Sequence, residues 1–117
     1  MKEKPGELQR LQHISKCISD LEEILKGVDA DSFYRNSEKK YAVERILEII
    51  GEAVNRISEQ TLAKSNQSIP WRDIVDFRNL VTHEYFRVDY TMIYKLATEE
   101  IPIIKSAIQF LIEKIQE

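Results

Sequence analysis

The sequence is poor in cysteine, which cross-links many small folds, and in glycine and proline, which form tight turns. Its 117 residues include one cysteine, three glycines and three prolines. Cys17 has no second cysteine with which to form an internal disulfide, and the scarcity of turn residues disfavours short strands joined by tight turns. A chain of this length can bury a core without disulfides or a metal. We therefore expect a single all-α domain over residues 1–117.

Features of membrane-bound and secreted proteins are also missing. No run of about 18 apolar residues suggests a membrane span, and no charged-then-apolar leader suggests secretion. We therefore expect no membrane partner and a cytoplasmic location. The net charge of −3 argues against a broad basic surface that would bind any nucleic acid through its phosphates. A small local basic pocket is compatible with this charge.

Apolar residues at spacings of three and four predict long amphipathic helices. The first should end near Lys26, because Gly27 suits the left-handed position that follows a helix. The second should begin at the capping pair Asn36 and Ser37 and run through Glu59.

This second helix combines an apolar face with an acidic one. Gly51 in its middle costs about 1 kcal/mol relative to alanine, so we expect another helix or a large side chain to come close there. Glu52 is expected to share a solvated face with Glu48, and a hydrogen bond to the region of Arg78 or His83 is the alternative. The predicted apolar face is Ala42, Ile46, Ile49, Ala53 and Ile57, thickened by Leu47, Ile50 and Val54, and the opposite side carries Glu44, Glu48, Glu52 and Asn55.

Two further helices follow a polar stretch, residues 60–70, most of which we expect to be a loop. Pro70 suits the start of a third helix from Trp71, and Asp89 is the expected N-cap of a long last helix, which Pro102 should kink. The architecture predicted is an up-and-down bundle of about four main helices. A short helix and its exposed exit loop between the third and the last would carry the chemistry.

Histidine titrates nearest neutral pH, and the chain has two. His13 lies beside the apolar stripe of the first helix and is expected to be a surface or boundary residue. His83 lies in the stretch RNLVTHEY, which also contains Arg78, Asn79 and Tyr85. This stretch is the only convincing chemical centre in the sequence.

Helix geometry limits how this stretch can work. On an ideal helix Arg78 and His83 are separated by about 140°, so they cannot face one target. Either the helix breaks, and His83 and Tyr85 project to one side of an extended segment, or two chains contribute. On residue types alone a structural interpretation stays open, with Arg78 paired to Asp76 or Glu84 and the tyrosine in the core.

The order and spacing of these residues resemble the HEPN superfamily, and more narrowly the HepT-like toxins of toxin–antitoxin pairs. The resemblance rests on a pattern in which four residues separate Arg78 from His83 and one residue separates His83 from Tyr85. It rests also on the segments IPWRDIVDFRN before this pattern and FRVDY after it. The segment AVERILEIIGEAVNRIS, residues 42–58, also looks like the family's second helix. Together these regions cover much of residues 40–105.

The resemblance implies a homodimeric endoribonuclease that needs neither metal nor cofactor, with Arg78 and His83 of both chains in a shared cleft. The chemistry is coherent, because RNA cleavage needs a base for the 2′-OH and positive charge at the phosphate. His83 suits the first role and Arg78 the second. Asn79 could hold the phosphate or the histidine ring, and the expected product is a 2′,3′-cyclic phosphate.

The resemblance gives Tyr85 a different role. In the family, the motif tyrosine receives AMP from the partner antitoxin, an MntA-like nucleotidyltransferase. An added AMP would compete with RNA for Arg78 and block the cleft. Without that transfer, Tyr85 would be an aromatic packing or stacking residue.

Other interpretations remain. The main alternative is a non-catalytic helical HEPN module that binds a nucleotidyltransferase. A carboxylate-bridged metal site would need paired Glu-x-x-His spacings, which the sequence lacks, so we expect no metal site. The third alternative is a purely structural four-helix protein with solvated charged faces.

Overall fold

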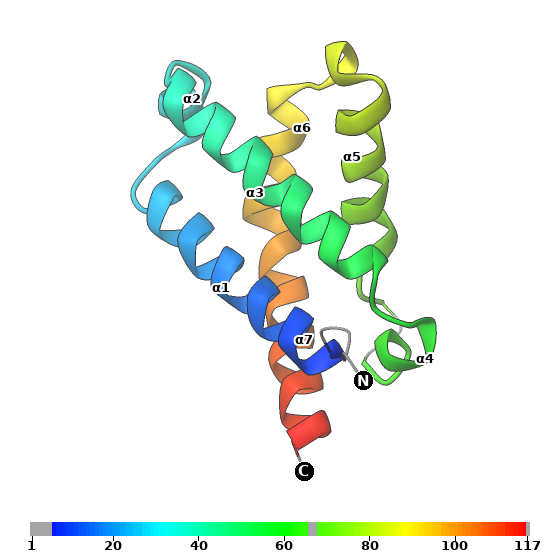
Figure 1. Ribbon diagram of the computed structural model, residues 1–117. Helices are drawn as coiled ribbons and strands as arrows, with labels where there is room; N and C mark the ends of the chain where they lie inside the picture. Colours follow the sequence, from blue (N-terminus) through cyan, green and yellow to red (C-terminus); the bar gives the residue numbers. More distant parts are fainter. Residues whose placement is uncertain (1–5, 66–67, 117) are drawn as a thin grey trace.

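Long helices that run in alternating directions form the molecule (Figure 1). The computed structural model describes residues 6–65 and 68–116, and that part of the chain contains no strand. The all-helical fold class is thus confirmed. The elements are α1 (Glu7–Leu25), α2 (Ala30–Tyr34), α3 (Ser37–Asn55), α4 (Glu59–Leu62), α5 (Trp71–His83), the 3-10 turn η1 (Tyr85–Arg87), α6 (Tyr90–Lys95), the π-helical turn η2 (Leu96–Glu100) and α7 (Ile101–Gln116).

The predicted helix caps are confirmed. The Asn36 side chain accepts a hydrogen bond from the backbone N–H of Lys39 at 3.0 Å and begins α3. Asp89 does the same for Thr91 at 2.9 Å and begins α6. Gly27 has a φ of +71°, the left-handed conformation expected after the first helix.

The helix predicted to run through Glu59 ends earlier, at Asn55. Most of residues 60–70 is not helical, as expected, although α4 occupies the start of this stretch. The Ser58 side chain accepts a hydrogen bond from the backbone N–H of Thr61 at 3.1 Å and caps this short helix. The Glu7 carboxylate accepts hydrogen bonds from the backbone N–H of Ser58 and from the Thr61 hydroxyl, which ties α4 to the start of α1. Residues 66–67 lie outside the described residues.

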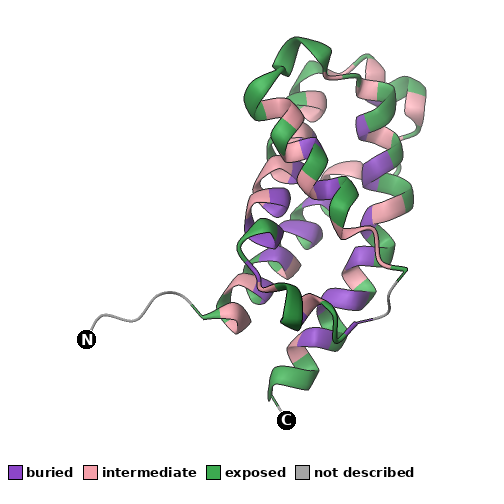
Figure 2. Ribbon diagram, turned by 90° about the vertical axis from the view of Figure 1, so that its right-hand side faces the viewer, coloured by how far each residue is buried: buried purple, intermediate pink, exposed green. Residues whose placement is uncertain are grey.

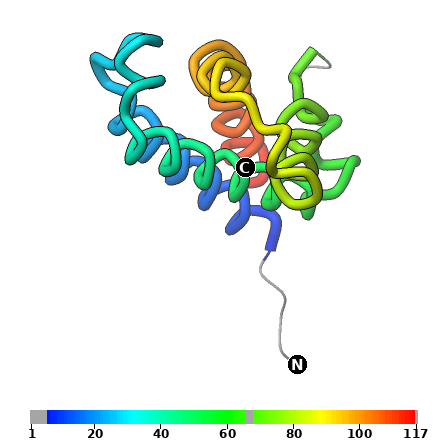
Figure 3. Tube along the Cα trace, turned by 90° about the horizontal axis from the view of Figure 1, so that it is seen from above, coloured from blue at the N-terminus to red at the C-terminus, as the bar shows by residue number. Residues whose placement is uncertain are grey.

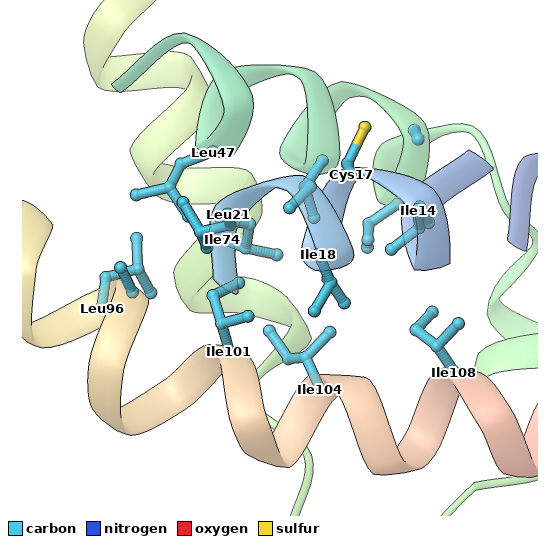
Figure 4. Packing of buried hydrophobic residues seen from close by; sticks show 14 of the residues in the cluster. Ile14, Cys17, Ile18, Leu21, Leu47, Ile74, Leu96, Ile101, Ile104 and Ile108 are labelled. Carbon is cyan, nitrogen blue, oxygen red and sulfur yellow. The ribbon is translucent and has the colours of Figure 1, made fainter. Parts of the chain in front are cut away.

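A continuous apolar core fills the space between the long helices. Figure 4 shows Ile101 and Ile104 of α7 directed toward Ile18 and Leu21 of α1. Buried residues line the inward sides of the helices, and exposed residues cover their outer sides (Figure 2). No helix among residues 6–65 and 68–116 has the length and apolar character needed to cross a membrane.

The predicted apolar face of α3 is partly confirmed, because five of its eight residues are buried: Leu47, Ile50, Ala53, Val54 and Ile57. Ala42, Ile46 and Ile49 are only half-buried. The reason is that α3 packs against α1 and also against α5, so its buried face turns toward the space between these two helices. The fully covered residues are Val43, Leu47, Ile50 and Val54.

The last long helix is continuous but widened before Pro102. The π-helical turn η2 ends at Glu100, two residues before the proline. Proline has no N–H and its ring crowds the carbonyl of the residue four positions earlier, so a wider turn relieves the helix there.

Burial, together with a hydrogen bond to Asp73 of α5, raises the pKa of Glu100 to about 7.

The close approach predicted at Gly51 is confirmed. A β-carbon on this residue would lie 2.5 Å from the carbonyl oxygen of Ile74 and 2.7 Å from Cβ of Arg78. Both contacts belong to α5, which lies beside α3 in two perpendicular views (Figures 1 and 3). The missing side chain at Gly51 therefore sets how near Arg78 comes to α3.

We predict that Gly51→Ala destabilises the protein by about 1–2 kcal/mol, although alanine is the better helix former by about 1 kcal/mol. The overlap with the Ile74 backbone cannot be relieved by a side-chain rotation, so α3 and α5 must separate. Urea unfolding measures the change. Gly6→Ala is the control, because nothing lies within 4 Å of a β-carbon at Gly6. Equal stability of Gly51→Ala and the wild type would contradict the close contact.

Candidate functional site

The stretch RNLVTHEY begins in α5 and ends in η1. The helix continues through His83, because the backbone N–H of Glu84 still donates to the carbonyl of Leu80 at 2.8 Å. Glu84 leaves the helical conformation, and Tyr85 then starts a 3-10 turn. The predicted break before His83 and the extended exit segment are therefore wrong, because α5 ends only after His83 and Tyr85 lies in the short 3-10 turn η1. Thr82 is a weak helix former, but its penalty of a few tenths of a kcal/mol is too small to end a packed helix.

One chain does not bring Arg78 and His83 together on one face. Both lie in the same helix, and five residues of α-helix turn through about 140° beyond a full turn. Arg78 is only 26% exposed and contacts α3, whereas His83 is exposed at the end of α5.

Arg78 is held by two side chains. Its Nε lies 2.7 Å from Oε1 of Glu52, and its Nη1 donates a hydrogen bond to Oδ1 of Asn79 at 2.8 Å. The ion pairs considered from the sequence, with Asp76 or Glu84, are not the ones formed. Asn79 thus orients the guanidinium group, and the two partners fix the direction of the fork.

Glu52 contacts two arginines of the site, Arg56 and Arg78. Its Oε2 accepts a hydrogen bond from Nε of Arg56 at 2.8 Å, while its Oε1 pairs with Arg78. Arg56 foremost, and Arg78 with it, hold the pKa of this carboxyl below its usual value. The favoured prediction of a merely solvated Glu52 is therefore wrong. The spacing of Glu48, Glu52 and Arg56 at four residues was the available signal.

Tyr85 is an exposed residue and not part of the core. Its side chain is 74% exposed, and its ring meets Phe86 edge-on with 6.2 Å between the ring centres. Beyond this turn, the hydroxyl of Tyr90 donates a hydrogen bond to Glu44 of α3 at 2.6 Å. The turn with Tyr85 is thus anchored to α3 on both sides, by Arg78 before it and by Tyr90 after it.

A hollow of about 400 Å³ opens between α1, α3 and α5 beside Arg78. We call it the arginine hollow. His13 lines it and is exposed, as expected of a surface residue, while His83 does not line it. Sequence analysis missed this site, because its walls come from three helices. Its lining residues are Arg10, His13, Arg45, Glu48, Ile49, Glu52, Ala53, Arg56, Arg78 and Thr82.

The side chains present suit phosphate chemistry. A guanidinium group offers a planar fork of donors that matches phosphate oxygens. An imidazole can transfer a proton near neutral pH. Within residues 6–65 and 68–116, no group of three or more His, Cys, Asp and Glu side chains is placed to bind a metal ion.

Comparisons with known proteins agree on one family. The family model described as "Ribonuclease HepT-like" matches residues 14–111. A relative named "Putative RNase" from Methanocaldococcus jannaschii is 36% identical over 101 residues, which are 86% of this chain and 92% of the relative. A relative named "Probable ribonuclease HepT" from Thermococcus cleftensis is 33% identical over 101 residues, 86% of this chain and 91% of its own.

A third relative, named "Putative RNase" and from Caldanaerobacter subterraneus subsp. tengcongensis, is 33% identical over 104 residues, 89% of this chain and 92% of the relative. No solved structure gives a significant match. The matched region includes all of α3, α5 and the motif from Arg78 to Tyr85. The chain belongs to the HepT-like ribonuclease family.

Proposed function

We propose that this protein is the toxin of a type VII toxin–antitoxin pair, an endoribonuclease that cuts RNA without a metal ion. Two copies would form the active cleft, with Arg78 and His83 as catalytic residues. A nucleotidyltransferase antitoxin would switch the activity off by adding AMP to Tyr85. One observation carries the proposal: an oriented arginine and an exposed histidine lie five residues apart in a helix of a HepT-like ribonuclease.

The reaction needs only these groups and the RNA. His83 takes the proton of the ribose 2′-OH, and the 2′-oxygen attacks the adjacent phosphorus. Arg78 stabilises the negative charge that gathers on the phosphate oxygens. The bond from phosphorus to the 5′-oxygen breaks, and this oxygen receives a proton as it leaves. The products are a 2′,3′-cyclic phosphate and a free 5′-hydroxyl.

A second copy supports this reaction in two ways. The helical geometry keeps Arg78 and His83 of one chain apart, so a histidine from the second chain could face the arginine of the first. The reaction also needs a base and an acid, and a second His83 or a water molecule would supply the missing role.

We predict that His83→Ala lowers the rate of RNA cleavage in excess chelator by about 10²–10⁴-fold, the usual contribution of acid–base catalysis. Its far-UV circular dichroism should stay helical, because His83 is exposed at the end of α5. Cleavage by a folded His83→Ala variant at the wild-type rate would refute the assignment. Absence of cleavage in the wild type would favour the non-catalytic HEPN module.

The Arg78→Gln variant tests the proposed role of Arg78 in stabilising the charge on the phosphate oxygens. We expect a comparable loss of cleavage, because the guanidinium fork is removed. Arg35→Gln is the matched control, since Arg35 is exposed after α2 and far from the motif in sequence.

The exposure of Tyr85 supports its role as the modified residue. A phenol that is 74% exposed can enter the active site of another enzyme without unfolding of its own chain. The added AMP brings a negative phosphate and a bulky base to a turn that starts two residues after His83. It would repel RNA and block the cleft.

We predict that co-expression with the cognate nucleotidyltransferase adds mass in multiples of AMP, and that Tyr85→Phe abolishes the gain. Intact-protein mass spectrometry measures it. Tyr41→Phe is the matched control, because Tyr41 is also exposed, at 64%, and lies outside the motif. An AMP gain that persists in Tyr85→Phe, or its absence from the wild type, would contradict the proposal.

A further inference from the structure

The long basic side chains that line the arginine hollow are arginines. Four of the seven arginines of the chain line it, and none of the eight lysines within residues 6–65 and 68–116 does. They come from α1 (Arg10), α3 (Arg45), the end of α3 (Arg56) and α5 (Arg78). Arginine differs from lysine in offering a planar fork that binds phosphate oxygens in pairs. The selection of arginine therefore points to a phosphate ligand rather than to a merely solvated surface.

The local charge of the hollow is opposite to that of the whole chain. Four arginines and the two glutamates, Glu48 and Glu52, give a charge of +2, before any contribution from His13. The whole chain carries −3. A polyanion is thus attracted to this hollow and repelled by much of the remaining surface, which would direct a strand to it.

The two glutamates orient the arginines without covering them. Nη1 of Arg45 donates to Glu48 at 3.1 Å, and Nε of Arg56 donates to Glu52 at 2.8 Å. The side chains of Arg45 and Arg56 are still 68% and 58% exposed. Each guanidinium group has five N–H donors, so a single carboxylate leaves donors free for a ligand.

The other wall adds Arg10 and His13, one helical turn apart on α1. Among the described residues, no ion pair is recorded for Arg10. His13 has Nε2 3.6 Å from the sulfur of Cys17 and is otherwise exposed. The hollow thus has cationic donors on two sides, and Arg78 belongs to it as well as to the motif.

We propose that the arginine hollow is a subsite for a backbone phosphate of the RNA strand, next to the phosphate that is cut. Arg10, Arg45, Arg56 and His13 bind this neighbouring phosphate, and Arg78 lies between the two positions. The inference rests on the proposed ribonuclease function for the identity of the strand. The subsite positions substrate, and its residues take no part in proton transfer.

The test compares two double variants that remove the same charge. Arg10→Gln with Arg45→Gln alters the hollow, and Lys26→Gln with Arg35→Gln alters exposed residues near α2. The probe is a fluorescent 2′-O-methyl RNA oligonucleotide, which lacks the attacking hydroxyl and cannot be cut. Fluorescence anisotropy at several salt concentrations gives its Kd.

We predict that the hollow variant binds this RNA about tenfold more weakly or worse, and that the slope of log Kd against log salt falls by about 0.7, the value for one phosphate contact on a single strand. The control variant should bind like the wild type. Equal binding by the two variants would overturn the subsite, and so would absence of binding by the wild type.

Cleavage distinguishes the subsite from the proposed function. A dinucleotide has no neighbouring phosphate, so the hollow variant should cut it at the wild-type rate and should show a raised KM only on longer RNA. Loss of both activities to the same degree would overturn a positioning role. If the wild type cuts no RNA but the hollow variant still loses binding, the ribonuclease proposal fails while the binding of an RNA phosphate in the hollow stands.

Binding of ATP separates a strand site from a nucleotide site. ATP carries phosphates without a strand, and it should displace the RNA only weakly. ATP binding that is tighter than RNA binding, and lost in the hollow variant, would overturn the assignment to a strand.

Discussion

The contact between α3 and α5 at Gly51 is the constraint on which the candidate site depends. Any side chain at this position would collide with the backbone of α5 at Ile74 and with Cβ of Arg78. With hydrogen alone at the contact, the arginine comes within reach of Glu52, the next residue of α3. A local loss of helix propensity in α3 is thus offset by a closer packing of two helices, and this packing positions the guanidinium group.

The acidic side of α3 then acts as a frame for the motif. Glu52 forms an ion pair with Arg78, and about two helical turns away Glu44 accepts a hydrogen bond from the hydroxyl of Tyr90. The end of α5 and the turn with Tyr85 lie between these two anchors and are exposed. This arrangement gives the arginine a fixed direction and leaves the histidine and the tyrosine accessible. A charged stripe that looks merely solvated in the sequence has a positioning role in the structure.

The fold could be predicted from local signals, and the site only in part. Caps such as Asn36 and Asp89 act through hydrogen bonds within three residues, so the sequence suffices for them. The helical state of His83 could not be predicted, because packing outweighed the weak propensity of Thr82. The arginine hollow could not be predicted either, since it exists only where three helices meet, although Glu48, Glu52 and Arg56 repeat at four residues.

The central proposal is that two copies share one cleft, because α5 keeps Arg78 and His83 of one chain on different faces. The most direct measurement mixes Arg78→Gln and His83→Gln variants, each inactive alone, and assays RNA cleavage after subunits have exchanged. A mixed pair would contain one intact arginine and one intact histidine, on different chains. The account predicts that part of the wild-type activity returns on mixing. No recovery, although mixed pairs are shown to form, would contradict it.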